Sequence, residues 1–176
     1  EVMHREVQAY LTGQEQSLAV PVPFRNLVAQ ARLGVSQAAH TAFFTEMLAD
    51  VTEPTLPFGL TEVHCDGSQI TESHRMLAPE LNDRLRHQAR QQGVSLAALC
   101  HLAWAQVLSR TSGQENVVFG TLLFGRMTGS EGVGGMGLFI NTLPLRLDMD
   151  DTPVQDSVQA AHHRLAGLLT HEHASL

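Results

Sequence analysis

Asn141 and Thr142 are the residues of this sequence whose types and placement best suit chemistry. They lie in the middle of an apolar run, residues 136–146 (MGLFINTLPLR), that has the composition of a buried strand. A buried amide or hydroxyl must be hydrogen-bonded, because an unpaired buried polar group costs roughly 1–3 kcal/mol. Asn141 can also offer both a donor and an acceptor to a bound molecule. We therefore expect this pair either to brace the fold or to line a binding site, and the residue types leave both roles open.

A second apolar run, residues 120–126 (GTLLFGR), comes earlier in the chain and ends in Phe124, Gly125 and Arg126. Arg126 and Arg146 each close an apolar run. An arginine at the end of a strand either reaches solvent and pairs with acidic side chains, or it contacts a substrate or partner. Both interpretations stay open for both arginines.

The glycine-rich segment 129–137 (GSEGVGGMG) lies between the two runs. It lacks the G-K-[ST] ending of a phosphate-binding loop, and it precedes a strand rather than a helix. The sequence therefore disfavours nucleotide binding at this segment. Its many glycines, the last of which is Gly137, indicate a flexible crossing or a lid instead.

Other catalytic and metal-binding patterns are weak. His162 and His163 are adjacent, and neighbouring residues on a helix point about 100° apart, so they cannot chelate one ion as an i, i+4 pair would. His171 and His173 have only Glu172 as a nearby carboxylate. The sequence contains no lysine, which excludes a Schiff base and a P-loop in this chain, and no G-x-S-x-G motif of a serine hydrolase. We expect no metal site and no complete catalytic set.

Composition narrows the class of protein. The chain has 176 residues, enough for one domain, and its formal net charge of −7 argues against nucleic acid as the main partner. No apolar run approaches the ~20 residues that span a bilayer, and no charged segment followed by an apolar stretch opens the sequence, so we expect no signal peptide. Cys65 and Cys100 form neither a disulfide framework nor a zinc signature. We expect a cytoplasmic protein without a membrane partner, and, because the chain begins at Glu1 without a methionine, a piece of a longer protein.

Helix signals indicate the elements that position these residues. Ser36 and Ser95 are suited to N-caps, and Pro79 is suited to a first helical turn. The helix after Ser95 has a wide apolar face that includes Cys100, and we expect it to be the most buried helix. The predicted helices cover residues 1–11, 23–32, 37–50, 79–92, 96–110 and about 153–171.

The remaining segments predict strands and one connector. Residues 51–59 contain two prolines and a glycine and are the best candidate for an internal linker. Residues 60–64 and 70–77 predict weak strands, whereas residues 120–126 and 136–146 predict buried strands with little polar alternation. Together the elements indicate an α/β domain, with a mixed sheet flanked by helices.

Residues 136–146 resemble a motif of the condensation domains of nonribosomal peptide synthetases, written roughly [IV]-G-x-F-[VI]-N-T-x-x-x-R. Residues 96–118 resemble the helix and strand that lead into this region of the family. Two other stretches agree more loosely: residues 24–30 (FRNLVAQ) with Y-x-D-Y-A-x-W, and residues 171–176 (HEHASL) with the start of H-Q-x-x-P-[FL]. The sequence is identified as a member of this family over essentially its whole length, 1–176.

The resemblance implies a chloramphenicol-acetyltransferase-like fold of two α/β halves that face each other across a tunnel, of which this chain supplies mainly the C-terminal half. Donor and acceptor carrier domains would deliver substrates on phosphopantetheine, and an amide bond would form between them. No cofactor would bind directly. The residues expected along the tunnel are Asn141, Thr142, Phe139, Phe124, Gly125 and Arg126, and those expected to be structural are Arg146 and Gly137.

The catalytic motif of the family, H-H-x-x-x-D-G, has no counterpart in this chain. His162 and His163 are followed by Gly167 and Leu168 where the motif requires Asp and Gly. We therefore expect the catalytic histidine to lie upstream, in an N-terminal half that would be the first partner, and this chain alone to be inactive. Two alternatives stay open: an epimerising or dual condensation and epimerisation relative, and a noncatalytic platform that binds carrier proteins.

Overall fold

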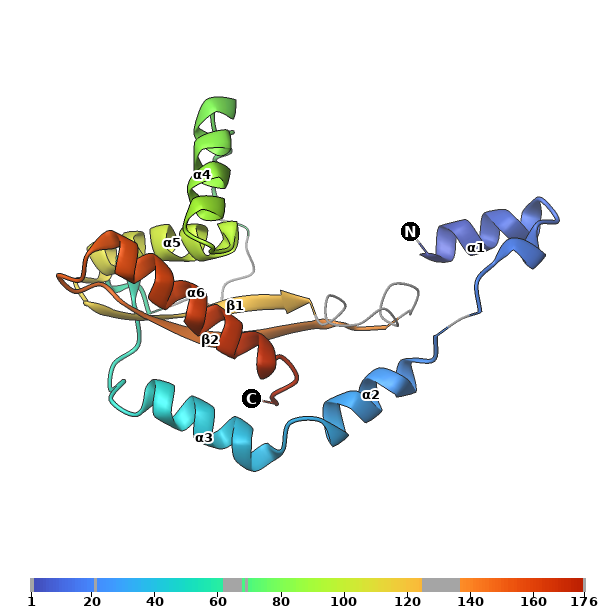
Figure 1. Ribbon diagram of the computed structural model, residues 1–176, viewed down its shortest axis with the longest axis horizontal. Coiled ribbons are helices and arrows are strands. Elements are labelled where there is room, and N and C mark those ends of the chain that lie inside the picture. Colours follow the sequence, from blue (N-terminus) through green and yellow to red (C-terminus); the bar gives the residue numbers. More distant parts are fainter. Residues whose placement is uncertain (1, 21, 62–67, 69, 125–136, 176) are drawn as a thin grey trace. The chain divides into compact units, whose positions relative to one another are not determined.

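The structure is a computed structural model that describes residues 2–20, 22–61, 68, 70–124 and 137–175 (Figure 1). The strands β1 (Asn116–Phe124) and β2 (Ile140–Asp148) pair in one antiparallel sheet. The helices agree closely with those predicted. They are α1 (Val2–Leu11), α2 (Phe24–Leu33), α3 (Gln37–Leu48), α4 (Pro79–Gln91), α5 (Leu96–Ser112) and α6 (Val154–Thr170), with the short 3-10 turns η1 (Glu15–Ser17) and η2 (Pro57–Gly59).

The chain divides into two units. The first consists of residues 1–44, 121–143 and 170–176, and the second consists of residues 45–120 and 144–169. The first unit contains α1, α2, most of α3 and the segment that follows α6. The second contains α4, α5 and nearly all of α6.

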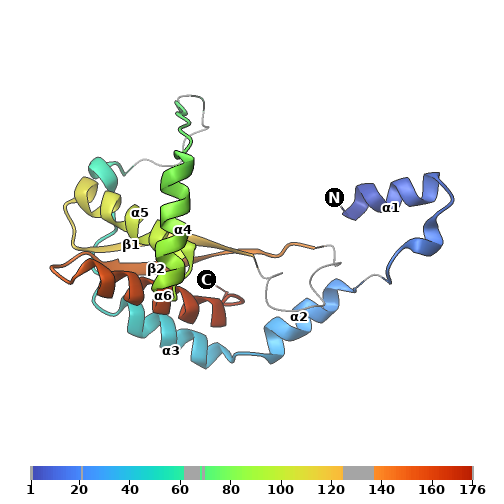
Figure 2. The ribbon, with the colours of Figure 1, turned by 45° about the horizontal axis from the view of Figure 1, so that its top comes forward.

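Helices α4, α5 and α6 share a hydrophobic core in the second unit. A short turn joins α4 to α5 (Figure 2). Ala89 of α4, Val94 of the turn and Val158 of α6 are buried together, and Leu99 and Leu102 of α5 pack against them. Removing this apolar surface from water is the main force that holds the three helices together.

The helix ends follow local sequence signals. The Ser95 Oγ accepts a hydrogen bond from the Ala98 N–H at 3.1 Å, and the Ser36 Oγ accepts one from the Ala39 N–H at 3.2 Å, so both predicted caps are confirmed. Helix α5 ends at Gly113, whose φ of 75° is left-handed. Within the described residues, no helix is long and apolar enough to cross a membrane.

The buried face of α5 differs from the predicted one. Ala98, Ala105 and Leu108 are buried, whereas Cys100 is exposed and Val107 is 49% exposed. The expectation that Cys100 is a core residue is therefore wrong. Because α5 carries apolar residues nearly all round, its periodicity does not specify which face packs against the rest of the unit.

Each strand buries alternate residues rather than its whole length. Leu143, Leu145 and Leu147 of β2 are buried, but Leu122 and Phe124 of β1 are about half exposed. The two runs are strands as predicted, but the prediction that they are buried holds only at alternate positions of the described residues, because composition alone does not show which side chains the packing covers. The boundaries also shift: β1 starts at residue 116, four residues before the predicted start, and residues 137–139 precede β2.

The predicted connector 51–59 is anchored to β1. The Val118 N–H donates to the Thr55 Oγ1 at 2.9 Å, and the Gln114 Nε2 donates to the Pro54 carbonyl at 3.1 Å. Thr55 thus supplies an acceptor for an N–H of β1, as a neighbouring strand would. Its role as a domain linker stays a prediction.

The two weak strands are not observed in the described part of the chain. Residues 70–77 form no strand, and neither do residues 60 and 61, while 62–64 lie outside the described residues. Ile70 and Met76 are 72% and 92% exposed. A single extended segment without a paired neighbour has no ladder to satisfy its backbone, so β-propensity alone does not make it a strand.

Candidate functional site

The side-chain amide of Asn141 holds the chain segment that follows α6. Its Nδ2 donates to the Glu172 carbonyl at 2.8 Å and to the Ala174 carbonyl at 2.9 Å. Its Oδ1 accepts a hydrogen bond from the Thr142 N–H at 3.0 Å. Both N–H bonds of the amide are therefore used inside the protein, and Asn141 acts as a clamp on residues 171–175.

A pair of histidines holds the same segment from α3. The Nδ1 atoms of His40 and His171 lie 2.9 Å apart, so one ring donates a proton and the other accepts it. His40 is 5% exposed, and the ring of Phe43 stacks on His171 with centroids 4.1 Å apart. Burial first, and then the neighbouring His40, lower the pKa of His171. The neutral form of His171 is thus the one that fits this environment.

A half-open hollow of about 270 Å³ lies beside the clamp, within the first unit. Phe139 meets Phe24 of α2 edge to face, with ring centroids 5.8 Å apart. Gly137 lies against the same ring: a Cβ at this position would come within 2.1 Å of the Phe24 Cδ2. The hollow is lined by Phe24, Leu27, Val28, Ala31, Arg32, Leu138, Phe139, Ile140, Asn141, Glu172 and His173.

The structure brings together some of the predicted site residues and leaves others apart. Phe139 and Asn141 both line the hollow, and Gly137 lies next to one of its walls. Thr142 is exposed and contributes its backbone N–H to Asn141. Phe124 is at the end of β1, 51% exposed, and does not line the hollow. The predictions for Gly125 and Arg126 fall outside the described residues.

Sequence reasoning missed the helix α2 and the segment 171–175 as parts of the site. Both stretches resemble family motifs, but neither carries a residue whose type alone indicates chemistry. In the sequence, Glu172 is an isolated acid. The signal that could have identified it is its position directly after a helix, next to a histidine, in a motif-like stretch.

The family model of the condensation domain matches residues 8–176. The chain belongs to the condensation domain family. It is 60% identical over its whole length to malpinin synthetase of Mortierella alpina, and 32% identical, over 96% of its length, to a linear gramicidin synthase protein of Brevibacillus parabrevis. The chain covers 2% of each of these two synthetases.

Solved condensation domains share the fold. The first condensation domain of the CDA synthetase matches 94% of this chain with a TM-score of 0.67 at 23% identity, and the chain covers 37% of it. The condensation domain of the monacolin K polyketide synthase MokA matches 91% with a TM-score of 0.68 at 19% identity, and 40% of it is covered. The expected chloramphenicol-acetyltransferase-like α/β fold class is thereby confirmed.

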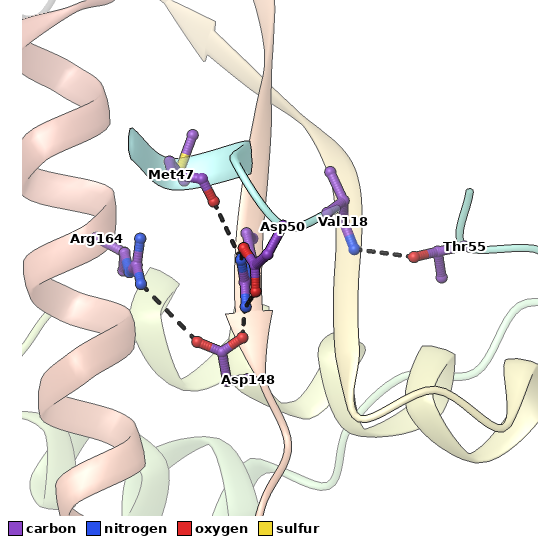
Figure 3. Close-up of polar contacts among 7 residues, drawn as sticks. Met47, Asp50, Thr55, Val118, Asp148 and Arg164 are labelled. Carbon is purple, nitrogen blue, oxygen red and sulfur yellow. Dashed lines mark hydrogen bonds and ion pairs between the residues drawn. The ribbon is translucent and has the colours of Figure 1, made fainter. Parts of the chain in front are cut away.

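Arg146, the last residue of the condensation-domain motif, lies in the second unit and pairs with acids. Its partners Met47, Asp50 and Asp148 are labelled in Figure 3. Its Nε donates to the Asp148 Oδ1 at 2.8 Å, and its Nη2 donates to the Asp50 Oδ2 at 3.0 Å, while its Nη1 also contacts Asp50. The Nη1 reaches the Met47 carbonyl at 3.4 Å. Two interpretations were open for Arg146, and the observed contacts are those of an arginine that pairs with acidic side chains. These contacts connect the end of α3 to β2.

Arg146 and the carboxylates around it each stabilise the charged form of the other. Its side chain is 11% exposed, and Asp148 also lies 3.8 Å from the guanidinium of Arg164. The hydrogen bond from Arg146 lowers the pKa of Asp50, and Asp50 in turn raises the pKa of Arg146. Arginine suits this position because its planar fork can meet two carboxylates at once.

Among the described residues, no group of three or more His, Cys, Asp or Glu could hold a metal ion. The polar side chains that line the hollow are Arg32, Asn141, Glu172 and His173. They can offer hydrogen bonds and charge to a bound molecule.

Proposed function

We propose that this chain forms part of the substrate-binding wall of a condensation domain that joins carrier-tethered aminoacyl or peptidyl thioesters in nonribosomal peptide synthesis. Membership of the condensation domain family and the synthetases among its relatives support this activity. The observation that carries the site is the clamp: Asn141, in the family motif, holds residues 171–175 beside an apolar hollow.

The reaction forms one C–N bond and breaks one C–S bond. The amine of the acceptor attacks the thioester carbonyl of the donor, loses a proton, and displaces the phosphopantetheine thiol, which leaves with a proton. No residue of this chain matches the family's catalytic histidine motif. The base therefore comes from the N-terminal half of the same domain, and two carrier domains present the substrates.

The contribution of this chain is placement. Holding two reactants in line can supply several kcal/mol of a barrier, and a small misplacement of a wall can cost a large part of it. In the proposed site, Asn141 contacts no substrate. It is a positioning residue that acts through the backbone of residues 171–175.

The experiment is amide formation by the parent synthetase carrying Asn141→Ala, with both carriers loaded. We expect kcat/KM for the amide product to fall by about tenfold or more, while circular dichroism and thermal unfolding show a folded protein. Asn82→Ala is the matched control, because the Asn82 Oδ1 accepts a hydrogen bond from Arg86 of its own helix in an exposed contact. Full activity in a folded Asn141→Ala protein would remove Asn141 from the site.

A further inference from the structure

The hydrogen bond between His40 and His171 limits the number of protons that the two rings can carry. Their Nδ1 atoms lie 2.9 Å apart, so one Nδ1 carries a proton and the other offers its lone pair. A neutral imidazole has a single N–H, on Nδ1 or on Nε2. The neutral pair therefore combines one ring of each tautomer, and the shared proton fixes the orientation of both rings.

Two added protons affect this pair differently. The first can go to the unprotonated Nε2 of the donor ring, and the hydrogen bond remains, because the acceptor Nδ1 keeps its lone pair. The second removes that lone pair, since a charged imidazolium has an N–H on both nitrogens. Two positive charges would then lie 2.9 Å apart beside a residue, His40, that is 5% exposed. Like charges repel strongly where solvent does not screen them, so the doubly charged pair separates.

Burial is the largest influence on the charge of His171. The other charged or titratable groups on the elements around the pair are Glu46 of α3, Arg25 and Arg32 of α2, and Glu172 and His173 of the segment 171–175. The ring of Phe43 stacks on His171 and covers one of its faces. Burial first, and then His40, lower the pKa of His171. A separated pair therefore takes up protons more readily than the buried one.

The pair connects the segment that lines the hollow to the helix that follows one of its walls. His171 begins the segment 171–175, whose next two residues line the hollow. His40 lies in the first turn of α3, which follows α2, and α2 also lines the hollow. All of these residues belong to the first unit. Asn141 holds the segment from β2, so the histidine pair is a second hold on the same five residues.

We propose that His40 is a second positioning residue for condensation: through the proton that it shares with His171 it keeps residues 171–175 in place, and this hold is lost when both rings become charged. The proposal rests on the proposed function and adds to it a residue of α3 and a dependence on pH. The clamp at Asn141 has no such dependence, because an amide does not titrate.

Two substitutions of His40 separate the hydrogen bond from its titration. The amide of His40→Asn can donate or accept near the position of Nδ1 and gains no charge, whereas His40→Leu offers neither a donor nor an acceptor. In the parent synthetase with both carriers loaded, we expect His40→Leu to lower kcat/KM for the amide product about tenfold at pH 7.5, and His40→Asn to restore most of it. Full activity in a folded His40→Leu protein would overturn the proposal.

The pH profile distinguishes positioning from a merely structural role. At each pH, kcat/KM of His40→Asn is divided by that of the wild type, which cancels the titrations of the acceptor amine and the catalytic base that both proteins share. We expect this ratio to rise about threefold or more between pH 7.5 and about 5.5, because only the wild type can collect two charges at the pair. His87→Asn, at an exposed position of α4, should give a constant ratio. A constant ratio for His40→Asn would overturn the proposal, whatever the absolute activity of that variant.

Hydrogen–deuterium exchange separates a failure of the pair from a failure of the function. In the synthetase without loaded carriers, exchange in 171–175 relative to α4 should rise on acidification in the wild type and rise less in His40→Asn. The same rise in both proteins would overturn the hold by the pair, whether or not amide product forms. The expected difference in exchange, without amide product from the wild type at any pH, would instead overturn the proposed function.

Discussion

The Nδ2 of Asn141 lies 2.8 Å from the carbonyl oxygen of Glu172, a residue 31 positions further along the chain. The side-chain amide of Asn141, which the sequence singles out as best suited to chemistry, therefore donates both of its N–H hydrogen bonds to backbone carbonyls. It shapes a wall of the hollow and does not reach into it with a free donor. This relationship gives the family's Asn-Thr motif a physical role in the present chain.

Replacing Asn141 by Asp should be destabilising despite the similar shape. The side chain of aspartate has no N–H, and its oxygens would face the carbonyl oxygens of Glu172 and Ala174. We expect the free energy of unfolding of the intact condensation domain to fall by roughly 2–4 kcal/mol, because two hydrogen bonds are lost and their acceptors are left unpaired. Chemical denaturation measures this, with Asn82→Asp as control. A change below about 0.5 kcal/mol would mean that the clamp does not hold the segment.

Gly137 should tolerate no side chain while Phe24 keeps its place. A Cβ at residue 137 would lie 2.1 Å from the Phe24 Cδ2, so the ring must move. We expect Gly137→Ala to cost about 1–3 kcal/mol of unfolding free energy, as overpacked sites do.

The matching test for Gly137 is a double-mutant cycle with Phe24→Ala. Once the ring is removed, the added methyl group has room, so the cost of Gly137→Ala should shrink by 1 kcal/mol or more, roughly the size of coupling seen between residues in contact. Additive effects would show that the two positions do not meet.

Contacts between residues that are close in the sequence could be predicted, whereas contacts between residues far apart in the sequence could not. The caps at Ser36 and Ser95 satisfy N–H groups three residues away, and Gly113 ends its own helix, so local patterns were sufficient. Arg146 and Asp50 are 96 positions apart, and the type of neither residue indicates which residue it pairs with. The motif identified Asn141 as important, but its partners are backbone carbonyls, which every residue possesses.

Local sequence patterns also could not predict which faces of the helices and strands are buried. Helix α5 is apolar nearly all round, so the exposure of Cys100 depends on which elements pack against the helix. The same holds for Phe124, whose apolar side chain is half exposed on β1. Composition predicts that an element is apolar, and tertiary packing decides which of its faces is covered.

Stability should depend on pH through His171. Its folded pKa lies below the ordinary value of 6.5 because burial and His40 disfavour the charged ring. The unfolded chain then binds the proton more readily, so the stabilisation is complete above pH 6.5 and is lost as the pH falls towards the folded pKa. Denaturation between pH 7.5 and about 5 should show this loss, and His171→Gln should remove it. His87→Gln, at an exposed position of α4, should leave this loss of stability unchanged. If the His171→Gln protein loses stability with falling pH as steeply as the wild type, His171 is not the source of the pH dependence.

Arg146 should not be replaceable by lysine. The guanidinium meets both Asp50 and Asp148, and an ammonium cannot reproduce that fork. We expect Arg146→Lys to lower Tm by several degrees, and Arg84→Lys, on the exposed side of α4, to leave it nearly unchanged. The pairing would be contradicted if Asp50→Asn lowered the Tm of the Arg146→Lys protein by as much as that of the wild type, since the two residues would then act independently.

Hydrogen–deuterium exchange of residues 171–175 tests the central claim most directly, because the account assigns Asn141 its role through this segment. In the parent synthetase carrying Asn141→Ala, we predict faster exchange in 171–175 than in the wild type, with exchange in α4 and α5 unchanged. If the segment exchanges at the wild-type rate in a variant that has lost activity, Asn141 acts by another route and the clamp is not its function.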